Sequence, residues 1–132
     1  LSGLANSVVV GVSKELFVVN DKLGTPTYTH DFASNVKLLL ERELWGLYNM
    51  VCGGITGRLE VAQELISILG LEKIVSITPV QSDYFKKEYY ADRPASERLL
   101  DTKLNLRKSN IMRDWKVCLR EYVESYYKNY LD

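Results

Sequence analysis

Net charge is the first thing this sequence lacks. Its 132 residues contain 17 lysines and arginines against 17 aspartates and glutamates, so the formal charge is zero. Without a global field the chain has no general attraction for nucleic acid or for a membrane surface, and we expect neither as a partner. No apolar run approaches the ~18 residues that a membrane-spanning helix requires. An anion could therefore be recruited only by a local cluster of basic residues.

Residues that bind metals or act as nucleophiles are also scarce. His30 is the single histidine, and the two cysteines, Cys52 and Cys118, lie far apart without a Cys-x-x-Cys or Cys/His pattern. A metal site would need more histidine or cysteine ligands, and a nucleophile would need a partnering base. We therefore expect no metal, a capping or surface role for His30, and reduced, buried thiols at both cysteines.

The segment from residue 18 to residue 33 organises the chain as a strand, a rigid corner and the start of a helix. A β-branched and aromatic run over residues 16–20 predicts a strand that ends near Asp21. Pro26 fixes its own φ and pushes the preceding residue toward extended geometry. Thr29 is the predicted cap of the following helix, and Asp31 lies where the positive end of the helix dipole favours an anion.

The remainder of the chain alternates between helical and strand-like patterns. Further strands are predicted over residues 47–52 and 74–80, a helical turn over 82–87, and helices over 30–43, 56–69, 99–106 and 114–131. Pro79 places its strand at a sheet edge, because proline cannot donate to a ladder. No linker, repeat or low-complexity segment divides the sequence, so we interpret residues 1–132 as a single α/β domain with a small mixed sheet and flanking helices.

The corner resembles a segment of a known enzyme family. Residues 19–27, followed by Asp31-Phe32-Ala33, are similar to the "V-x-D-Q-x-G-x-P-T … D-x-A" segment of dTDP-4-dehydrorhamnose reductases, which are extended short-chain dehydrogenases. Arg93-Pro94 and a later Lys-Leu pair match the family's next segments, and the resemblance runs from about residue 17 to residue 122. Lys22 stands where the family usually has Gln. Glu97 stands where it usually has Ser, so no serine contact is transferred.

Two motifs of the family's hydride-transferring members are missing from this chain. The first is the G-x-x-G-x-x-G turn that admits a pyrophosphate, and the second is a Tyr-x-x-x-Lys pair for acid–base catalysis. The glycine-rich residues 53–57 lack the required spacing and are interpreted as a plain loop. In the family both motifs precede the corner, so their absence is what a C-terminal, substrate-binding part would show. The family also has a helix before the strand at residues 16–20, which favours a helix over residues 1–13, although their apolar pattern suits a strand equally.

Candidate ligand-binding residues lie at the corner and in a basic segment. Residues 86–116 contain nine basic residues against five acidic ones, a local net charge of +4, although an ordinary solvated face would look the same. A diphosphate favours a planar, permanently charged guanidinium on a rigid backbone, which makes Arg93 the best candidate. Three polar side chains of the corner could bind the same ligand, although the turn could also use them. The candidate substrate-binding residues are therefore Asp21, Thr25, Thr27 and Arg93.

The resemblance implies that this chain holds a sugar nucleotide, a dTDP-sugar, for the NAD(P)H-dependent reduction of a 4-keto sugar in dTDP-rhamnose synthesis. It is not expected to be catalytic alone: NADPH or NADH would be bound by the full-length family member, through an N-terminal Rossmann half that this chain lacks. The alternative is a non-catalytic interaction module that keeps the family's scaffold and exposes apolar surface. Such a module could form a homodimer through that surface. Either protein is expected in the cytoplasm.

Overall fold

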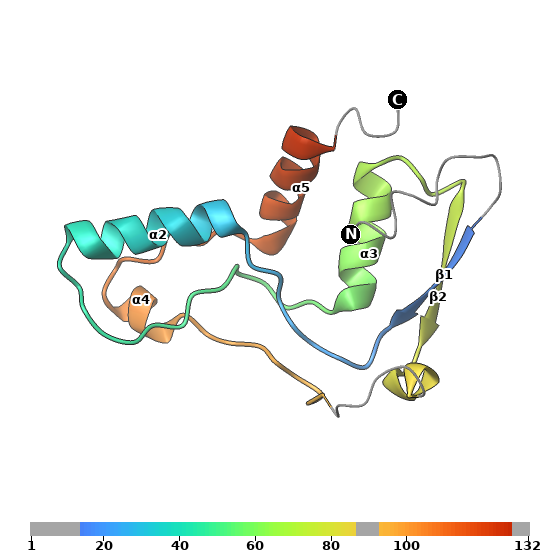
Figure 1. Cartoon of the computed structure of the whole chain (residues 1–132), viewed down its shortest axis with the longest axis horizontal. Helices are drawn as coiled ribbons and strands as arrows, with labels where there is room; N and C mark the ends of the chain where they lie inside the picture. Colours follow the sequence, from blue (N-terminus) through green and yellow to red (C-terminus); the bar gives the residue numbers. More distant parts are fainter. Residues whose placement is uncertain (1–13, 87–92, 128–132) are drawn as a thin grey trace.

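The computed structural model describes residues 14–86 and 93–127 and contains two strands, four α-helices and a short 3-10 helix (Figure 1). The expected helix or strand over residues 1–13 lies outside the described residues. In chain order the elements are β1 (Lys14–Val19), α2 (Thr29–Glu41), α3 (Arg58–Ile68), β2 (Val75–Val80), η1 (Ser82–Phe85), α4 (Thr102–Leu106) and α5 (Trp115–Tyr126).

The sheet consists of β1 and β2, which run parallel with Lys14 opposite Val75 and Val19 opposite Val80. α3 lies beside this sheet in Figure 1 and packs against it. A buried cluster joins helix and sheet, formed by Ile66, Leu71 and Val75 with Leu16, Leu69 and Ile77 around it. The predicted α/β class is confirmed, as are both of these strands and the position of β2 at a sheet edge.

A second buried cluster joins α5 to the start of α2. It contains Tyr28, Cys52, Trp115 and Cys118, with Val61, Met112, Leu119 and Tyr122 packed against it. Both cysteines are free and buried, as predicted. Their sulfur atoms lie 3.7 Å apart, and the Cys118 thiol also donates to the Asp31 carboxylate at 3.3 Å. Burial, together with the negative charge of Asp31, raises the pKa of the Cys118 thiol. This cysteine is therefore a packing residue with little thiolate character.

The prediction of a strand over residues 47–52 is wrong, because this segment has no ladder partner in the described part of the chain. Its polar groups are satisfied in other ways: the amide of Val51 donates to the Asp101 carboxylate at 3.1 Å, and the side chain of Asn49 donates to the carbonyl of Leu100 at 3.2 Å. Leu47 is 88% exposed. An apolar run predicts burial on both faces, but here it crosses the molecule as a loop.

The helix boundaries also differ from their predicted caps. Tyr28, not Thr29, precedes α2, and it makes no side-chain capping bond. α3 begins after Gly57, whose amide donates to the Glu60 carboxylate at 2.9 Å, so the helix predicted over residues 56–69 starts two residues later than expected. α5 spans Trp115–Tyr126, and residues 128–131 of the predicted helix lie outside the described residues.

The buried face of α2 is largely polar, although the helical spacing of Phe32, Val36, Leu39 and Leu40 predicts an apolar stripe. Asp31, Asn35 and Leu39 are buried, whereas Phe32 and Leu40 are exposed. Asn35 is completely buried. Its amide nitrogen donates to the carbonyl of Ser109 at 2.9 Å, and its oxygen accepts from the amide of Ile111 at 2.9 Å. One side chain therefore attaches α2 to the loop between α4 and α5.

Substituting Asn35→Ala should lower the free energy of unfolding by about 2–4 kcal/mol, because it leaves the carbonyl of the buried Ser109 and the partly buried amide of Ile111 without these partners. Urea denaturation followed by circular dichroism measures the loss. Ser34→Ala, which changes the exposed neighbour on the same helix, should stay within about 0.5 kcal/mol of the parent chain. Equal stability of the two variants would contradict a structural role for Asn35.

Candidate functional site

The predicted corner is the place where three distant segments of the chain cross. Leu23 lies between two of them: its amide donates to the carbonyl of Ala95 at 2.9 Å, and its carbonyl accepts from the amide of Glu97 at 2.9 Å. On the other side, the amide of Gly24 donates to the carbonyl of Thr56 at 3.0 Å. The structure therefore brings the corner together with the segment that begins at Arg93, although about seventy residues separate them in sequence.

Lys22 binds the backbone of Arg93, the residue predicted to bind an anion. The ammonium group of Lys22 donates to the carbonyl of Arg93 at 2.6 Å. The guanidinium of Arg93 lies 3.5 Å from the carboxylate of Glu97, and both side chains are more than half exposed. An exposed ion pair of this kind contributes little to stability, so the guanidinium can exchange its carboxylate for another anion at small cost.

The polar side chains of the corner differ in how far the chain itself uses them. The Asp21 carboxylate accepts from the amide of Ser82 at 3.0 Å and from its hydroxyl at 2.7 Å. The hydroxyl bond is the main reason that the pKa of Asp21 lies below its usual value. The Thr25 hydroxyl donates to the carbonyl of Gly54 at 3.1 Å. Thr27 is exposed. Asp21 and Thr25 thus support the corner, whereas Thr27 faces solvent.

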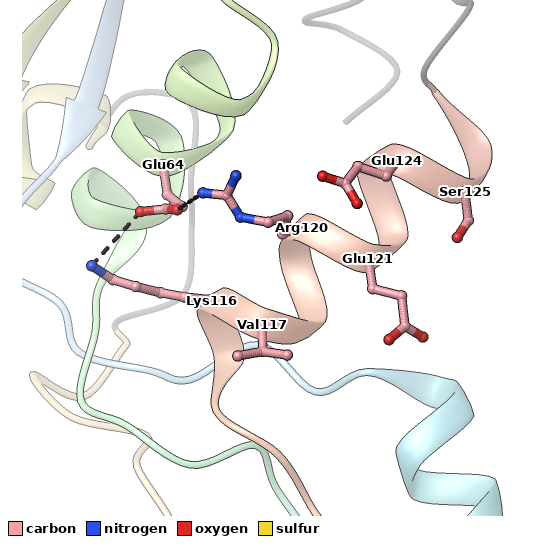
Figure 2. A pocket seen from close by; sticks show the side chains of 7 residues that line it. All are labelled: Glu64, Lys116, Val117, Arg120, Glu121, Glu124 and Ser125. Carbon is pink, nitrogen blue, oxygen red and sulfur yellow. Dashed lines mark hydrogen bonds and ion pairs between the residues drawn. The ribbon is translucent and has the colours of Figure 1, made fainter.

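The basic segment predicted from the sequence does not act as one surface. Arg113 is bound to Asp31 and Glu121, and Lys116 pairs with Glu64 at 3.7 Å. Figure 2 shows Glu64 of α3 between Lys116 and Arg120 of α5, where Arg120 approaches it to 3.3 Å. These residues border an open hollow of about 480 Å³. Its lining carries three carboxylates, those of Glu64, Glu121 and Glu124, against two cations, so it offers no net attraction to an anion.

Arg113 binds the buried carboxylate of Asp31, a contact that was not predicted from the sequence. Its guanidinium donates to both oxygens of the buried Asp31 carboxylate at 2.7–3.1 Å, and its amide donates to the same carboxylate at 3.1 Å. The bonds from Arg113 hold the pKa of Asp31 below its usual value. The signal was present in the sequence: Asp31, Asn35 and Leu39 recur every four residues, so two polar residues share the helix face of a buried leucine.

The described residues form neither a metal-ion site nor a membrane-spanning helix. Within residues 14–86 and 93–127, no group of three or more histidine, cysteine, aspartate or glutamate residues is placed to hold a metal ion. No helix in the same part of the chain is long and apolar enough to cross a membrane.

Comparison with known proteins completes this picture. The RmlD substrate binding domain family matches residues 8–128, which is most of the chain. The chain belongs to this family. The resemblance of the corner to dTDP-4-dehydrorhamnose reductases is thereby confirmed, and the crossing at Leu23 is part of an RmlD substrate binding domain.

Three relatives define how much of the family's length is present. A dTDP-4-dehydrorhamnose reductase from Clostridium acetobutylicum superposes with a TM-score of 0.81 at 31% identity, over 94% of this chain and 41% of that protein. The reductase from Bacillus anthracis, solved in complex with NADP, has a TM-score of 0.79 over 95% of this chain and 41% of that protein; at 24% identity this likeness concerns the fold alone. The spore coat polysaccharide biosynthesis protein SpsK of Bacillus subtilis is 34% identical over 113 residues, 84% of this chain and 37% of SpsK. The chain thus spans about two fifths of these relatives.

Gly57 makes the crossing at the corner possible. A Cβ atom at this position would lie 2.7 Å from the backbone carbonyl of Lys22, whereas a Cβ at Gly24 would meet nothing within 4 Å. Gly57→Ala should therefore lower the free energy of unfolding by about 1–3 kcal/mol, since backbone must move to admit the methyl group. Gly24→Ala is the matched control and should change it by less than about 1 kcal/mol. Urea denaturation of both variants tests the crossing, and a tolerated Gly57→Ala would argue against it.

The pair between Asp31 and Arg113 predicts a pH dependence of stability. Because the folded-state pKa of Asp31 is below its unfolded value of 3.8, its contribution is fully present above about pH 4 and is lost as the pH falls through the folded pKa. Asp31→Asn should cost roughly 2 kcal/mol at pH 7, and this difference should shrink progressively below about pH 4. Denaturation at a series of pH values measures it, with Glu72→Gln as the exposed control. A difference that is constant with pH would contradict the ionised pair.

Proposed function

We propose that this chain is the sugar-nucleotide-binding part of a dTDP-4-dehydrorhamnose reductase-like oxidoreductase. In this proposal it holds a dTDP-sugar for reduction of the 4-keto group, in the synthesis of dTDP-rhamnose. The observation that carries the proposal is the crossing at Leu23, which lies in a chain of this family and holds Thr27 and Arg93 on segments joined by hydrogen bonds. The Arg93 guanidinium supplies the charge for a diphosphate, and corner hydroxyls supply hydrogen bonds.

The corner suits ligand binding because it is held in place before any ligand arrives. Asp21 is fixed by Ser82, and Lys22 holds the backbone of Arg93 at 2.6 Å. Only the exposed ion pair with Glu97 has to open when the Arg93 guanidinium takes a phosphate instead. A preorganised site of this kind loses less conformational entropy on binding than a mobile loop would.

Catalysis would require polypeptide beyond this chain. Hydride transfer needs a nicotinamide cofactor and an acid–base tyrosine, and the sequence offers neither a dinucleotide-binding turn nor a Tyr-x-x-x-Lys pair. We therefore assign NADPH or NADH to a Rossmann half that acts together with this part, in the cytoplasm.

A second candidate function is a non-catalytic interaction module. The observation in its favour is the exposure of large apolar side chains around the loop that follows α2 and around α4. Trp45 is 68% exposed, Leu47 88%, and Leu100 and Leu106 79% each. Apolar surface of this extent is typical of a protein interface, so a homodimer is the expected form of such a module.

Binding of dTDP, measured by isothermal titration calorimetry, tests the first proposal. Arg93→Ala should weaken the affinity by about tenfold, because a charge-assisted hydrogen bond to the phosphate is lost. Lys37→Ala is a matched control, because it also removes a cation from an exposed ion pair, the one that Lys37 makes with Glu41 on α2. Its affinity should equal that of the parent chain.

Three outcomes would contradict the proposal. They are absence of dTDP binding together with a stable dimer, equal loss in both variants, and NADPH oxidation by this chain alone in the presence of a 4-keto sugar nucleotide. The first of these outcomes would favour the interaction module. The third would contradict the assignment of catalysis to other polypeptide.

A further inference from the structure

Two cations converge on Tyr48 at the other end of the molecule from the sheet (Figure 1, around α4). The ammonium group of Lys103 lies 4.4 Å from the centre of the Tyr48 ring, and the guanidinium carbon of Arg107 lies 5.7 Å from it. Arg107 also donates to the Tyr48 hydroxyl at 2.7 Å. Lys103 and Arg107 are separated by four residues, so they project from the same side of α4 and its C-terminal end.

Gly46 provides the space in which the Lys103 ammonium lies. The backbone of Gly46 has a φ of +128°, and a Cβ atom there would lie 2.7 Å from the Lys103 nitrogen. The same ammonium donates to the carbonyl of Leu47 at 3.0 Å. The lysine is thus held by a glycine, a backbone carbonyl and an aromatic face, which is more order than a surface lysine normally has.

The charge of this cluster is not compensated by the residues that the structure describes. Within residues 14–86 and 93–127, ion pairs involve Lys37, Arg93, Arg113, Lys116 and Arg120, but neither Lys103 nor Arg107. Two like charges beside one ring repel each other, and an anion placed between them would remove this repulsion.

We propose that Tyr48, Lys103 and Arg107 form an anion site for a phosphorylated small molecule, separate from the corner and independent of the function proposed there. The ammonium keeps two N–H donors after its bond to Leu47, and the guanidinium keeps its remaining donors in a planar fork. The Tyr48 hydroxyl accepts from Arg107, so its own proton is free to be donated to a phosphate oxygen. A diphosphate, with charge spread over several oxygens, matches this set of donors.

Inorganic pyrophosphate is the probe for this site, and amide chemical shifts in a ¹⁵N-labelled chain report where it binds. At low ionic strength, pyrophosphate should shift the amides of residues 46–49 and 102–107. Lys103→Met and Arg107→Met keep the aliphatic stems but remove the charges, and each should weaken the affinity by about fivefold, the upper range for an exposed charge pair. Lys73→Met, which changes an exposed lysine in the loop before β2, is the control and should bind as the parent chain does.

The site-resolved readout separates this site from the corner. Shifts confined to residues 22–27 and 93–97 would overturn the present proposal while supporting the one made for Arg93, and the reverse pattern would do the opposite. Unchanged binding in Lys103→Met and Arg107→Met, with dispersed spectra, would also overturn it. If Lys103→Met fails to fold, Lys103→Arg retains the charge and Arg107→Met supplies the loss of affinity, so the comparison remains decisive.

Discussion

The ion pair between Arg113 and Asp31 is the interaction on which the arrangement of the helices depends. The guanidinium and the amide of Arg113 both bind the Asp31 carboxylate, while the carbonyl of Arg113 accepts from the amide of Gly53 at 2.9 Å. One residue thus holds α2, the loop at Gly53 and the start of α5. Replacing both charges by apolar groups need not cost stability, but removing Arg113 alone leaves the buried Asp31 carboxylate without its ion pair. The pair therefore specifies the geometry more than it adds stability.

Tyr28 connects the corner to this ion pair, because the guanidinium of Arg113 lies 5.9 Å from the centre of the Tyr28 ring. The ring of Tyr28 packs in the core beside Cys52 and Trp115, and its amide donates to the Cys52 sulfur at 3.3 Å. The carboxyl-terminal end of the corner is thereby fixed in the core, while Asp21 fixes the other end to Ser82. Between these two anchors the chain is crossed by two other segments at Leu23. A short segment held at both ends and at its centre can present side chains in fixed directions without regular secondary structure.

Local patterns in the sequence predicted the helices and strands better than they predicted the contacts between them. β1, β2 and α3 follow from residue type and spacing, and α3 and β2, which are adjacent in sequence, pack against each other. The helical spacing of Phe32, Val36 and Leu39 predicts that Phe32 faces the core, but Asp31 takes the inner face of α2 instead. Its partner, Arg113, lies about eighty residues away, so local spacing does not reveal the pair. The apolar run at residues 47–52 was mistaken for a strand for a related reason. Its hydrogen-bond partners include a side chain, Asp101, that no periodicity reveals.

The distribution of positive charge in the fold is also decided by contacts between residues that are distant in sequence. Counting residues 86–116 suggests one basic surface, but at physiological salt charges separated by more than about 8 Å scarcely act together. Five of these nine basic residues fall into three groups in the fold. Arg113 and Lys116 are neutralised by carboxylates from other elements, Arg93 is paired weakly at the corner, and Lys103 and Arg107 lie beside Tyr48 without a carboxylate in the described part of the chain. Because the last two groups keep a charge that no buried carboxylate neutralises, recognition of a phosphate there depends on which carboxylates the fold leaves out of reach.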